Sequence, residues 1–299
     1  MKPPSFRYHA PTSLDEALGL LARYERAAMI LAGGQSLIPL LNARRVGPEH
    51  VVDINRIREL DYVRTAVDGV RIGAVARQAR LEHDVAARAA LPLIAQTLPW
   101  VGRPATRNRG TVVGSLAHAD PAAELPCIFT LMEGTVSLAR AGGTRSQSAR
   151  QFFMASGEER IAPDEIVFDA SLPAVPPRSG TAFAEVSRRK GDLPVCAVAS
   201  FVAVDARGHI ESARVTCAAC GPCPVTTDLT SCLTGAAPHE APMHEAARRV
   251  QAAISPCSDI HADAAYRRHL AGILASRTLR SAAAECLRNL LATAEELKP

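Results

Sequence analysis

Two glycine-bearing stretches contain the residues best suited to bind a charged ligand. The first, Ala32-Gly33-Gly34-Gln35-Ser36, follows the apolar run 28–31 and precedes an apolar segment that begins at Leu37. Adjacent residues without a Cβ permit positive φ angles and let a ligand approach the backbone amides. We expect a strand, a tight loop and a helix capped by Ser36, with the amides and the helix dipole facing an anion such as a pyrophosphate. Adjacent glycines are also common in plain turns, so this stretch alone leaves both interpretations open.

The second stretch, residues 102–126, is again small, polar and glycine-bearing. Its first part, 102–110, is expected to be a long polar loop, and a loop of this length suggests a binding role. A helix is expected from about 122 to 132. A family resemblance described below implies binding residues in this stretch, which are Thr106, Asn108, Gly110, Thr111, Gly114, Ser115, His118 and Glu124.

The motifs of several enzyme classes do not occur in the sequence. Gly33 and Gly34 are not followed by the third glycine of a dinucleotide-binding fingerprint, which disfavours a Rossmann domain. A nucleophile elbow, a metalloprotease helix motif and a P-loop are also missing. We therefore assign no catalytic residue and no metal ligand from the sequence.

Three further segments combine with the glycine stretches into a family pattern: Val52-Asp53-Ile54, Arg188-Arg189-Lys190-Gly191-Asp192 and Ser258-Asp259-Ile260-His261-Ala262. Together they resemble the FAD-binding medium subunit of the molybdenum hydroxylases, the family of carbon monoxide dehydrogenase, quinoline oxidoreductase and xanthine dehydrogenase. The resemblance covers nearly the whole chain. It implies an α+β fold, in which a two-lobed FAD-binding domain of the non-Rossmann PCMH type precedes a C-terminal domain of antiparallel sheet and helices.

The resemblance also implies roles for the candidate residues, because FAD lies extended between the first two lobes in that family. Residues Ala32 to Ser36 would hold the pyrophosphate, Leu37 would belong to the same cofactor site, and Thr111, Gly114 and Ser115 would approach the phosphates and the ribityl chain. Glu124 would accept hydrogen bonds from a ribose. The alternatives are ordinary loop capping for Thr111 and Ser115 and a surface helix charge for Glu124.

The flavin end of the site is implied by residues from the second and third parts of the chain. His118 would lie near the ring, although a lone histidine is often structural. Lys190 and Asp192 would reach the isoalloxazine, unless they belong to a solvated charge run. Leu193 replaces a tyrosine of several bacterial relatives, so we expect a change in acceptor access to one flavin face. Unchanged reoxidation rates with every acceptor in a Leu193→Tyr variant would argue against that expectation.

The resemblance implies that the chain carries FAD and transfers electrons within a complex. A small partner subunit would supply [2Fe-2S] clusters, a large one would carry the molybdenum cofactor, and the assembly would be a dimer of heterotrimers. Electrons would leave to an external acceptor, and the sequence specifies neither that acceptor nor the substrate. A stand-alone FAD oxidase, an iron–sulfur carrier and a scaffold without flavin are the alternatives.

Composition sets limits on the other classes of function. The chain has 299 residues, a net charge of +4 and scattered basic residues without aromatic interleaving, so binding to nucleic acid is not expected. No run approaches the length of a membrane span, and residues 1–5 lack the apolar core of a signal peptide. We expect a cytoplasmic protein of two or three domains.

Eight cysteines are present, and a cytoplasmic location would keep them reduced. Cys217, Cys220 and Cys223 have the two-residue spacings of iron–sulfur ligands. A fourth ligand with matching spacing is missing, and buried inert thiols are the other interpretation.

The elements that would position these residues fall into three units. The first lobe, 1–57, has expected strands at 6–9, 28–31 and 50–54, with helices after Ser13 and Gly34. The second lobe, 58–176, has a hairpin at Asp68-Gly69 and strands at 135–139 and 165–172. Three prolines between 173 and 177 mark the boundary of a C-terminal domain, 177–299. There we expect a three-stranded antiparallel sheet, 181–187, 198–205 and 210–217, covered by helices at 241–254 and 263–291.

Overall fold

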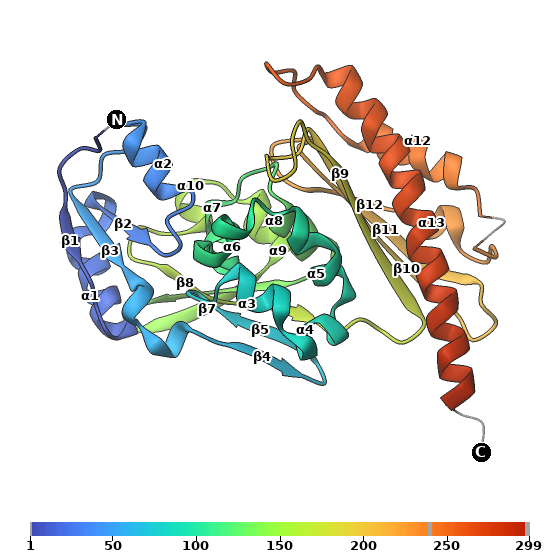
Figure 1. The fold of residues 1–299 in the computed structure, drawn as a ribbon, viewed down its shortest axis with the longest axis horizontal. Coiled ribbons are helices and arrows are strands. Elements are labelled where there is room, and N and C mark those ends of the chain that lie inside the picture. Colours follow the sequence, from blue (N-terminus) through green and yellow to red (C-terminus); the bar gives the residue numbers. More distant parts are fainter. Residues whose placement is uncertain (1, 239–240, 297–299) are drawn as a thin grey trace.

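The computed structural model describes residues 2–238 and 241–296, in which three β-sheets are flanked by helices (Figure 1). The first sheet is parallel, with the strand order β1-β3-β2. Helix α1 (Leu14–Tyr24) buries Ala17, Leu18 and Leu21, and Ser13 caps it by accepting a hydrogen bond from the Glu16 amide. The other elements of this lobe are β1 (Arg7–His9), β2 (Ala28–Leu31), α2 (Leu37–Asn42) and β3 (His50–Asp53).

The second sheet has five strands in the order β4-β5-β8-β6-β7. Its strands are β4 (Val63–Ala66), β5 (Gly69–Gly73), β6 (Thr135–Arg140), β7 (Gly143–Ser148) and β8 (Ile166–Pro173). The predicted hairpin at Asp68-Gly69 is present between β4 and β5. Strand β7 was not predicted, because it is a polar, largely exposed edge strand without an apolar period.

Short helices lie beside this sheet and between it and the third sheet (Figure 1). They are α3 (Gln78–His83), α4 (Val85–Ala90), α5 (Pro92–Thr97), α6 (Pro104–Arg109), α7 (Val112–His118), α8 (Glu124–Leu131), α9 (Ala149–Met154) and α10 (Gly157–Arg160). Single 3₁₀ turns occur at Glu25–Ala27, Ile54–Arg56, Arg58–Leu60 and Leu98–Trp100.

The prediction of a long loop at 102–110 was wrong, because helix α6 occupies most of this segment. Pro104 begins the helix, where its missing N–H costs no hydrogen bond. Arg107 is buried and forms two hydrogen bonds with the Glu82 carboxylate, at 2.6 and 2.9 Å. A polar sequence therefore forms a helix here because one arginine is paired in the interior.

The third sheet is antiparallel and has four strands, in the order β12-β11-β10-β9, rather than the expected three. The additional strand β12 is a four-residue edge strand, too short and polar to give a clear sequence signal. The elements are β9 (Ser179–Val186), β10 (Cys196–Val204), β11 (Ile210–Ala218), β12 (Val225–Asp228), α11 (Thr230–Leu233), α12 (Met243–Ala253) and α13 (Ala264–Glu296).

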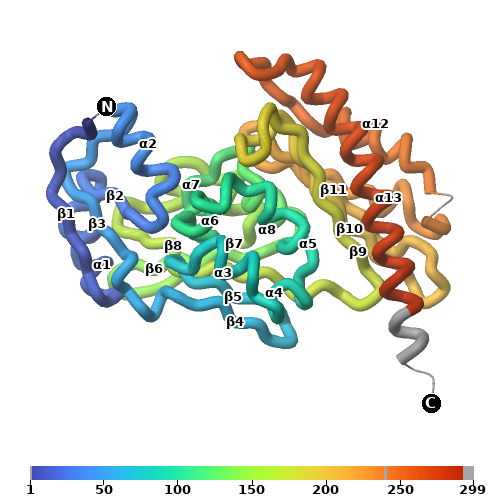
Figure 2. Tube along the Cα trace, in the orientation of Figure 1, coloured from blue at the N-terminus to red at the C-terminus, as the bar shows by residue number. Residues whose placement is uncertain are grey.

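Strand β10 has apolar residues facing both sides of this sheet. Val198 and Val202 belong to the core formed with α12 and α13, whereas Ala199 and Phe201 belong to the core that the second lobe shares with the first. Both faces of β10 are covered, which requires apolar side chains at nearly every position, and its sequence is accordingly an almost continuous apolar run. The trace in Figure 2 shows this sheet standing between the long helix α13 and the helices of the second lobe.

None of the helices among residues 2–238 and 241–296 is both long and apolar enough to cross a membrane.

Candidate functional site

A cavity of about 510 Å³ lies where the first glycine stretch meets α7 and the segment 161–167. The structure brings eleven of the sequence-predicted residues to its wall. They are Ala32, Gly33, Gly34, Gln35, Ser36, Leu37, Gly110, Thr111, Gly114, Ser115 and His118. The two glycine stretches, far apart in sequence, therefore form one site.

Gly33 has a structural role that the sequence did not indicate. A Cβ on Gly33 would lie 2.6 Å from the carbonyl oxygen of Arg109 and 2.9 Å from the amide nitrogen of Thr111. The missing side chain thus lets the two stretches touch each other, rather than only opening space for a ligand. Gly34 has a φ of 73°, so its own requirement is the left-handed backbone.

The loop at 33–36 presents unused hydrogen-bond donors. Within the described residues, the backbone N–H groups of Gly33, Gly34, Gln35 and Ser36 donate no hydrogen bond. The N–H groups of Thr111 and Val113 in the second stretch are also without a protein acceptor there. Because backbone donors are rarely left unpaired unless water or a ligand accepts from them, this cluster is suited to an anion.

The expectation that Ser36 caps helix α2 was wrong. Ser36 has helical backbone angles, φ −104° and ψ −48°, and its side chain accepts no capping hydrogen bond. The chain already turns at Gly34, whose carbonyl accepts from the Ile38 amide at 3.1 Å. An N-cap residue needs an extended backbone. Within the described part of the chain, the Ser36 hydroxyl therefore has no protein partner and is available at the cavity wall.

Thr111 performs the capping that was considered as its alternative role. It is extended, and its hydroxyl accepts a hydrogen bond from the Gly114 amide at 3.1 Å. A Cβ on Gly114 would lie 2.4 Å from that hydroxyl, so glycine is required there. The cap fixes the start of α7 and with it the position of Ser115 on the cavity wall.

Another part of the cavity wall was missed by sequence reasoning. It consists of Ile161, Ala162, Pro163, Glu165 and the first residues of β8, Ile166 and Val167. The Glu165 carboxylate accepts two hydrogen bonds from Arg145, at 2.6 and 2.7 Å, and one from the Ala162 amide at 2.9 Å. The hydrogen bond to Arg145 lowers the pKa of Glu165. No motif marks this wall, because it depends on where β8 enters its sheet.

Six predicted residues do not line this cavity. Thr106 and Asn108 lie on α6, and Lys190 is exposed. Glu124 begins α8 with only 4% of its surface exposed, and burial raises its pKa to about 7. Asp192 and Leu193 line a second cavity instead.

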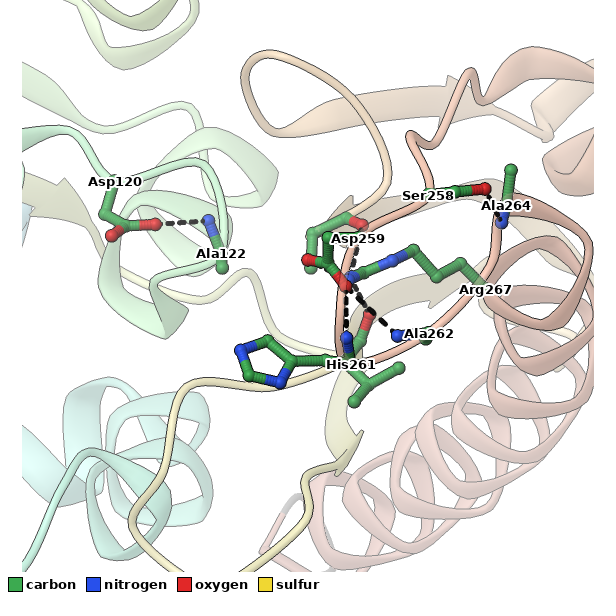
Figure 3. Close-up of polar contacts among 10 residues, drawn as sticks. Asp120, Ala122, Ser258, Asp259, His261, Ala262, Ala264 and Arg267 are labelled. Carbon is green, nitrogen blue, oxygen red and sulfur yellow. Dashed lines mark hydrogen bonds and ion pairs between the residues drawn. The ribbon is translucent and has the colours of Figure 1, made fainter.

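The second cavity, of about 390 Å³, lies between Ala122 and the segments 188–195 and 259–267. Figure 3 shows His261 projecting from the C-terminal side toward the side that carries Asp120 and Ala122. The loop before α13 is fixed by Asp259, which accepts hydrogen bonds from the His261 and Ala262 amides and from Arg267, at 2.8, 3.0 and 2.6 Å. These contacts, the two amides first, lower the pKa of Asp259 to about 2.

Arg267 connects this loop to the third sheet. Its guanidinium donates to the Val195 carbonyl at 2.6 Å and to the Ala219 carbonyl at 3.3 Å. The family segment 258–262 is thereby held at the edge of the cavity that also contains Asp192 and Leu193. The short segment from His118 to Ala122 separates the two cavities along the chain.

The cysteines at 217, 220 and 223 do not converge on a metal site in the described chain. Cys217 and Cys220 are buried, Cys223 is partly exposed, and the Cys220 sulfur lies 3.5 Å from that of Cys196. Contact with Cys220 and burial raise the pKa of Cys217. Among residues 2–238 and 241–296, no group of three or more histidine, cysteine or carboxylate side chains is arranged to hold a metal ion.

Comparison with known proteins agrees with this geometry. A family model described as the FAD binding domain in molybdopterin dehydrogenase matches residues 4–175, and one described as the CO dehydrogenase flavoprotein C-terminal domain matches 181–282. The chain belongs to the FAD-binding subunits of the molybdenum hydroxylases. The family predicted from the sequence is therefore confirmed, and FAD is the cofactor of this chain.

Relatives of this flavoprotein family align over nearly the whole chain. Subunit alpha of the 6-hydroxypseudooxynicotine dehydrogenase complex of Paenarthrobacter nicotinovorans is 35% identical over 94% of this chain and 96% of the relative. The carbon monoxide dehydrogenase medium chain of Hydrogenophaga pseudoflava is 33% identical over 96% of this chain and 100% of its own. The structure of quinoline 2-oxidoreductase from Pseudomonas putida 86 superposes with a TM-score of 0.89 at 31% identity, covering 96% of this chain and 100% of the other. The predicted fold class is confirmed.

The donor set of the first cavity fits part of FAD. In the described parts of the chain, six backbone N–H groups without protein acceptors and the hydroxyls of Ser36 and Ser115 are neutral donors, which suit a pyrophosphate, and apolar residues such as Ile30 and Ile166 line the same space.

Proposed function

We propose that this chain is the electron-transfer subunit of a molybdenum hydroxylase. Bound FAD supplies the redox chemistry, because the flavin accepts electrons from a donor and passes them to an acceptor. The observation that carries the proposal is the composition of the first cavity. Among the described residues, its polar groups without a protein partner include backbone amides, the hydroxyls of Ser36 and Ser115 and the imidazole of His118. Its carboxylate, Glu165, is paired with Arg145. Such a site holds a cofactor, and His118 is the one side chain on its described wall suited to act as an acid or base.

The two cavities suggest the direction in which FAD lies. We place the pyrophosphate against residues 33–36 and the start of α7, where the free amides are. The flavin end would then pass His118 and approach the second cavity, which Asp192 and Leu193 line. Lys190 is exposed on the same loop and would reach the ring only from its solvent side.

The partners follow from the family and remain part of the proposal. Relatives are called medium chains or subunits of dehydrogenase complexes, which supports a large and a small partner. The large one would carry the molybdenum cofactor and the small one [2Fe-2S] clusters, in a cytoplasmic dimer of heterotrimers. We propose no substrate, because oxidation would occur on the large subunit.

The test is a visible spectrum of the full chain, produced alone and together with its genomic neighbours, with iron and molybdenum determined on each sample. Flavin bands alone in the isolated chain, with both metals only in the co-purified complex, would support the proposal. Substrate turnover by the isolated chain would support a stand-alone oxidase instead. Iron in the isolated chain that disappears in Cys220→Ser would support an iron–sulfur carrier, and a colourless chain that still joins the complex would indicate a scaffold.

A further inference from the structure

Asn55 and Arg77 connect the two glycine stretches from outside the cavity. The Asn55 side-chain amide donates to the carbonyl oxygen of Ala32 at 2.8 Å. One terminal nitrogen of Arg77 donates to the Asn55 side-chain oxygen at 2.6 Å, and the other donates to the carbonyl oxygen of Arg109 at 2.5 Å. Two side chains thus link the backbone just before Gly33 to the backbone just before Gly110. Neither side chain lines the cavity.

Both linking residues are themselves held in place. Asp53 accepts hydrogen bonds from the Asn55 backbone at 2.9 Å and from its side-chain nitrogen at 2.5 Å, which fixes the orientation of the amide. The backbone around Arg77 pairs with the second stretch: Gln78 donates to the Gly110 carbonyl at 2.9 Å, and Val112 donates to the Ala76 carbonyl at 3.3 Å. The link is therefore anchored at both ends.

On the Arg77 side, this link ends at the atom that limits how closely the two glycine stretches approach each other. The Arg109 carbonyl that accepts from Arg77 is the same atom that a Cβ on Gly33 would meet at 2.6 Å. Its position decides how closely the free amides of residues 33–36 stand to those of Thr111 and Val113. A shift of this carbonyl would separate the two sets of donors.

Arg77 also brings a positive charge to this place. Its side chain is half-buried, and burial, with the nearby Arg109, lowers its pKa, although a guanidinium stays protonated. Its hydrogen-bond partners are uncharged oxygens, and within the described residues no carboxylate forms an ion pair with it. Asp53 and Asp61 lie near enough to raise the pKa of Arg77, but neither forms a hydrogen bond with the guanidinium, so its charge still favours an anion on the other side of the loops.

We propose that Asn55 and Arg77 are positioning residues for the pyrophosphate of FAD, which align the two donor loops from behind and add positive potential to them. This inference rests on the proposed placement of the pyrophosphate. It predicts that the affinity for any ligand with the same diphosphate depends on residues that never touch it.

The experiment measures dissociation constants of FAD and ADP for the flavin-stripped full chain by calorimetry and flavin fluorescence. The variants are Arg77→Met, Asn55→Ala, their combination and Arg77→Lys. Arg80→Met is the matched control, because Arg80 lies one turn further along α3 and contacts Asp61 instead. We expect each single variant to weaken FAD and ADP alike by about tenfold, because a hydrogen bond from a charged group is lost or disconnected. The loss of affinity in the double variant should be far smaller than the product of the two single-variant losses, since either change breaks the same link.

A readout independent of binding separates positioning from general stability. We expect the melting temperature of the flavin-free chain to change no more in Arg77→Met than in Arg80→Met, and Arg77→Lys to recover part of the affinity because it keeps the charge. If the wild-type chain binds FAD and ADP, and Arg77→Met binds them as tightly as Arg80→Met does, the inference is overturned and the proposed function stands. A parallel loss of melting temperature and affinity, without recovery in Arg77→Lys, would also overturn it. A wild-type chain that binds neither FAD nor ADP would overturn the placement of the pyrophosphate itself.

Discussion

At the scale of single residues, Gly33 shows that a glycine can help to form a ligand site by letting another loop pack closely against it. We predict that Gly33→Ala lowers FAD affinity at least tenfold and the free energy of unfolding by about 1–3 kcal/mol, because the new methyl group meets the backbone of residues 109–111, which must then shift. Flavin titration and urea unfolding would measure both effects. Gly143→Ala is the control, since a Cβ there has no neighbour within 4 Å. Equal behaviour of the two variants would show that the contact at residue 33 can relax.

Glu124 gives a prediction about pH. Burial raises its pKa from the ordinary value of 4.5 to about 7 in the folded chain, so the folded state resists its ionisation. Below about pH 4.5 the carboxyl is protonated in both the folded and the unfolded chain, so its burial does not lower the stability of the folded state by this route. As the pH rises toward 7, only the unfolded chain loses the proton, and the folded state loses stability relative to it. We predict that Glu124→Gln stabilises the flavin-free chain by about 2–3 kcal/mol above pH 7.

Melting of the Glu124→Gln variant between pH 4.5 and 8 would measure this gain, which should shrink as the pH falls. Glu159→Gln, an exposed change on α10, is the control. If the Glu124 carboxyl group accepts hydrogen bonds from the FAD ribose, as the family resemblance implies, the same variant should also lose FAD affinity. A stabilisation that does not vary with pH would contradict the assigned cause.

Much of the candidate site could be predicted from the sequence, and the remainder became visible only in the folded structure. The glycines at 33 and 34 and the donors beside them were indicated by strand, loop and helix signals, whereas Gly114 and its neighbours were indicated by the family resemblance. Asn55 and Arg77 were missed because they act through other side chains across the first two lobes. The apolar wall at 161–167 was missed for a similar reason, since its place depends on β8 rather than on a local motif.

At the scale of elements, α6 depends on a buried ion pair. Arg107 and Glu82 have side chains only 9% and 14% exposed. We predict that Arg107→Met lowers the free energy of unfolding by about 3–5 kcal/mol, because it leaves the Glu82 carboxylate buried without its partner. The combination of Arg107→Met with Glu82→Leu should recover most of that loss. Urea unfolding of both variants checks the prediction, and a double variant less stable than the single one would refute it.

The sequence predicted elements well where burial produced an apolar period and poorly where it did not. Strands β10 and β11 and helices α12 and α13 were found because their buried positions recur. Strands β7 and β12 were missed because both are polar edge strands whose pairing is decided by their neighbours. Helix α6 was mistaken for a loop because the interior partner of Arg107 lies 25 residues away.

At the scale of the whole molecule, Phe201 joins the C-terminal sheet to the second lobe. Its ring is 3% exposed, and the Arg214 guanidinium lies 4.4 Å from its centre while donating to the Leu131 carbonyl at 2.6 Å. We predict that Phe201→Ala lowers the free energy of unfolding by about 3–5 kcal/mol and separates one calorimetric transition into two. Met154→Ala, at an exposed position, is the control. A single transition of unchanged sharpness would show that the two cores do not depend on this contact.

The two apolar faces of β10 limit how this protein can exchange parts with its relatives. A strand without a polar side cannot be moved as a cassette, because its inner face must match the α8 surface of the recipient, just as the neighbouring β9 must match α5. A chimaera joined near residue 177 should fold only if those two helices come from the same parent as the sheet.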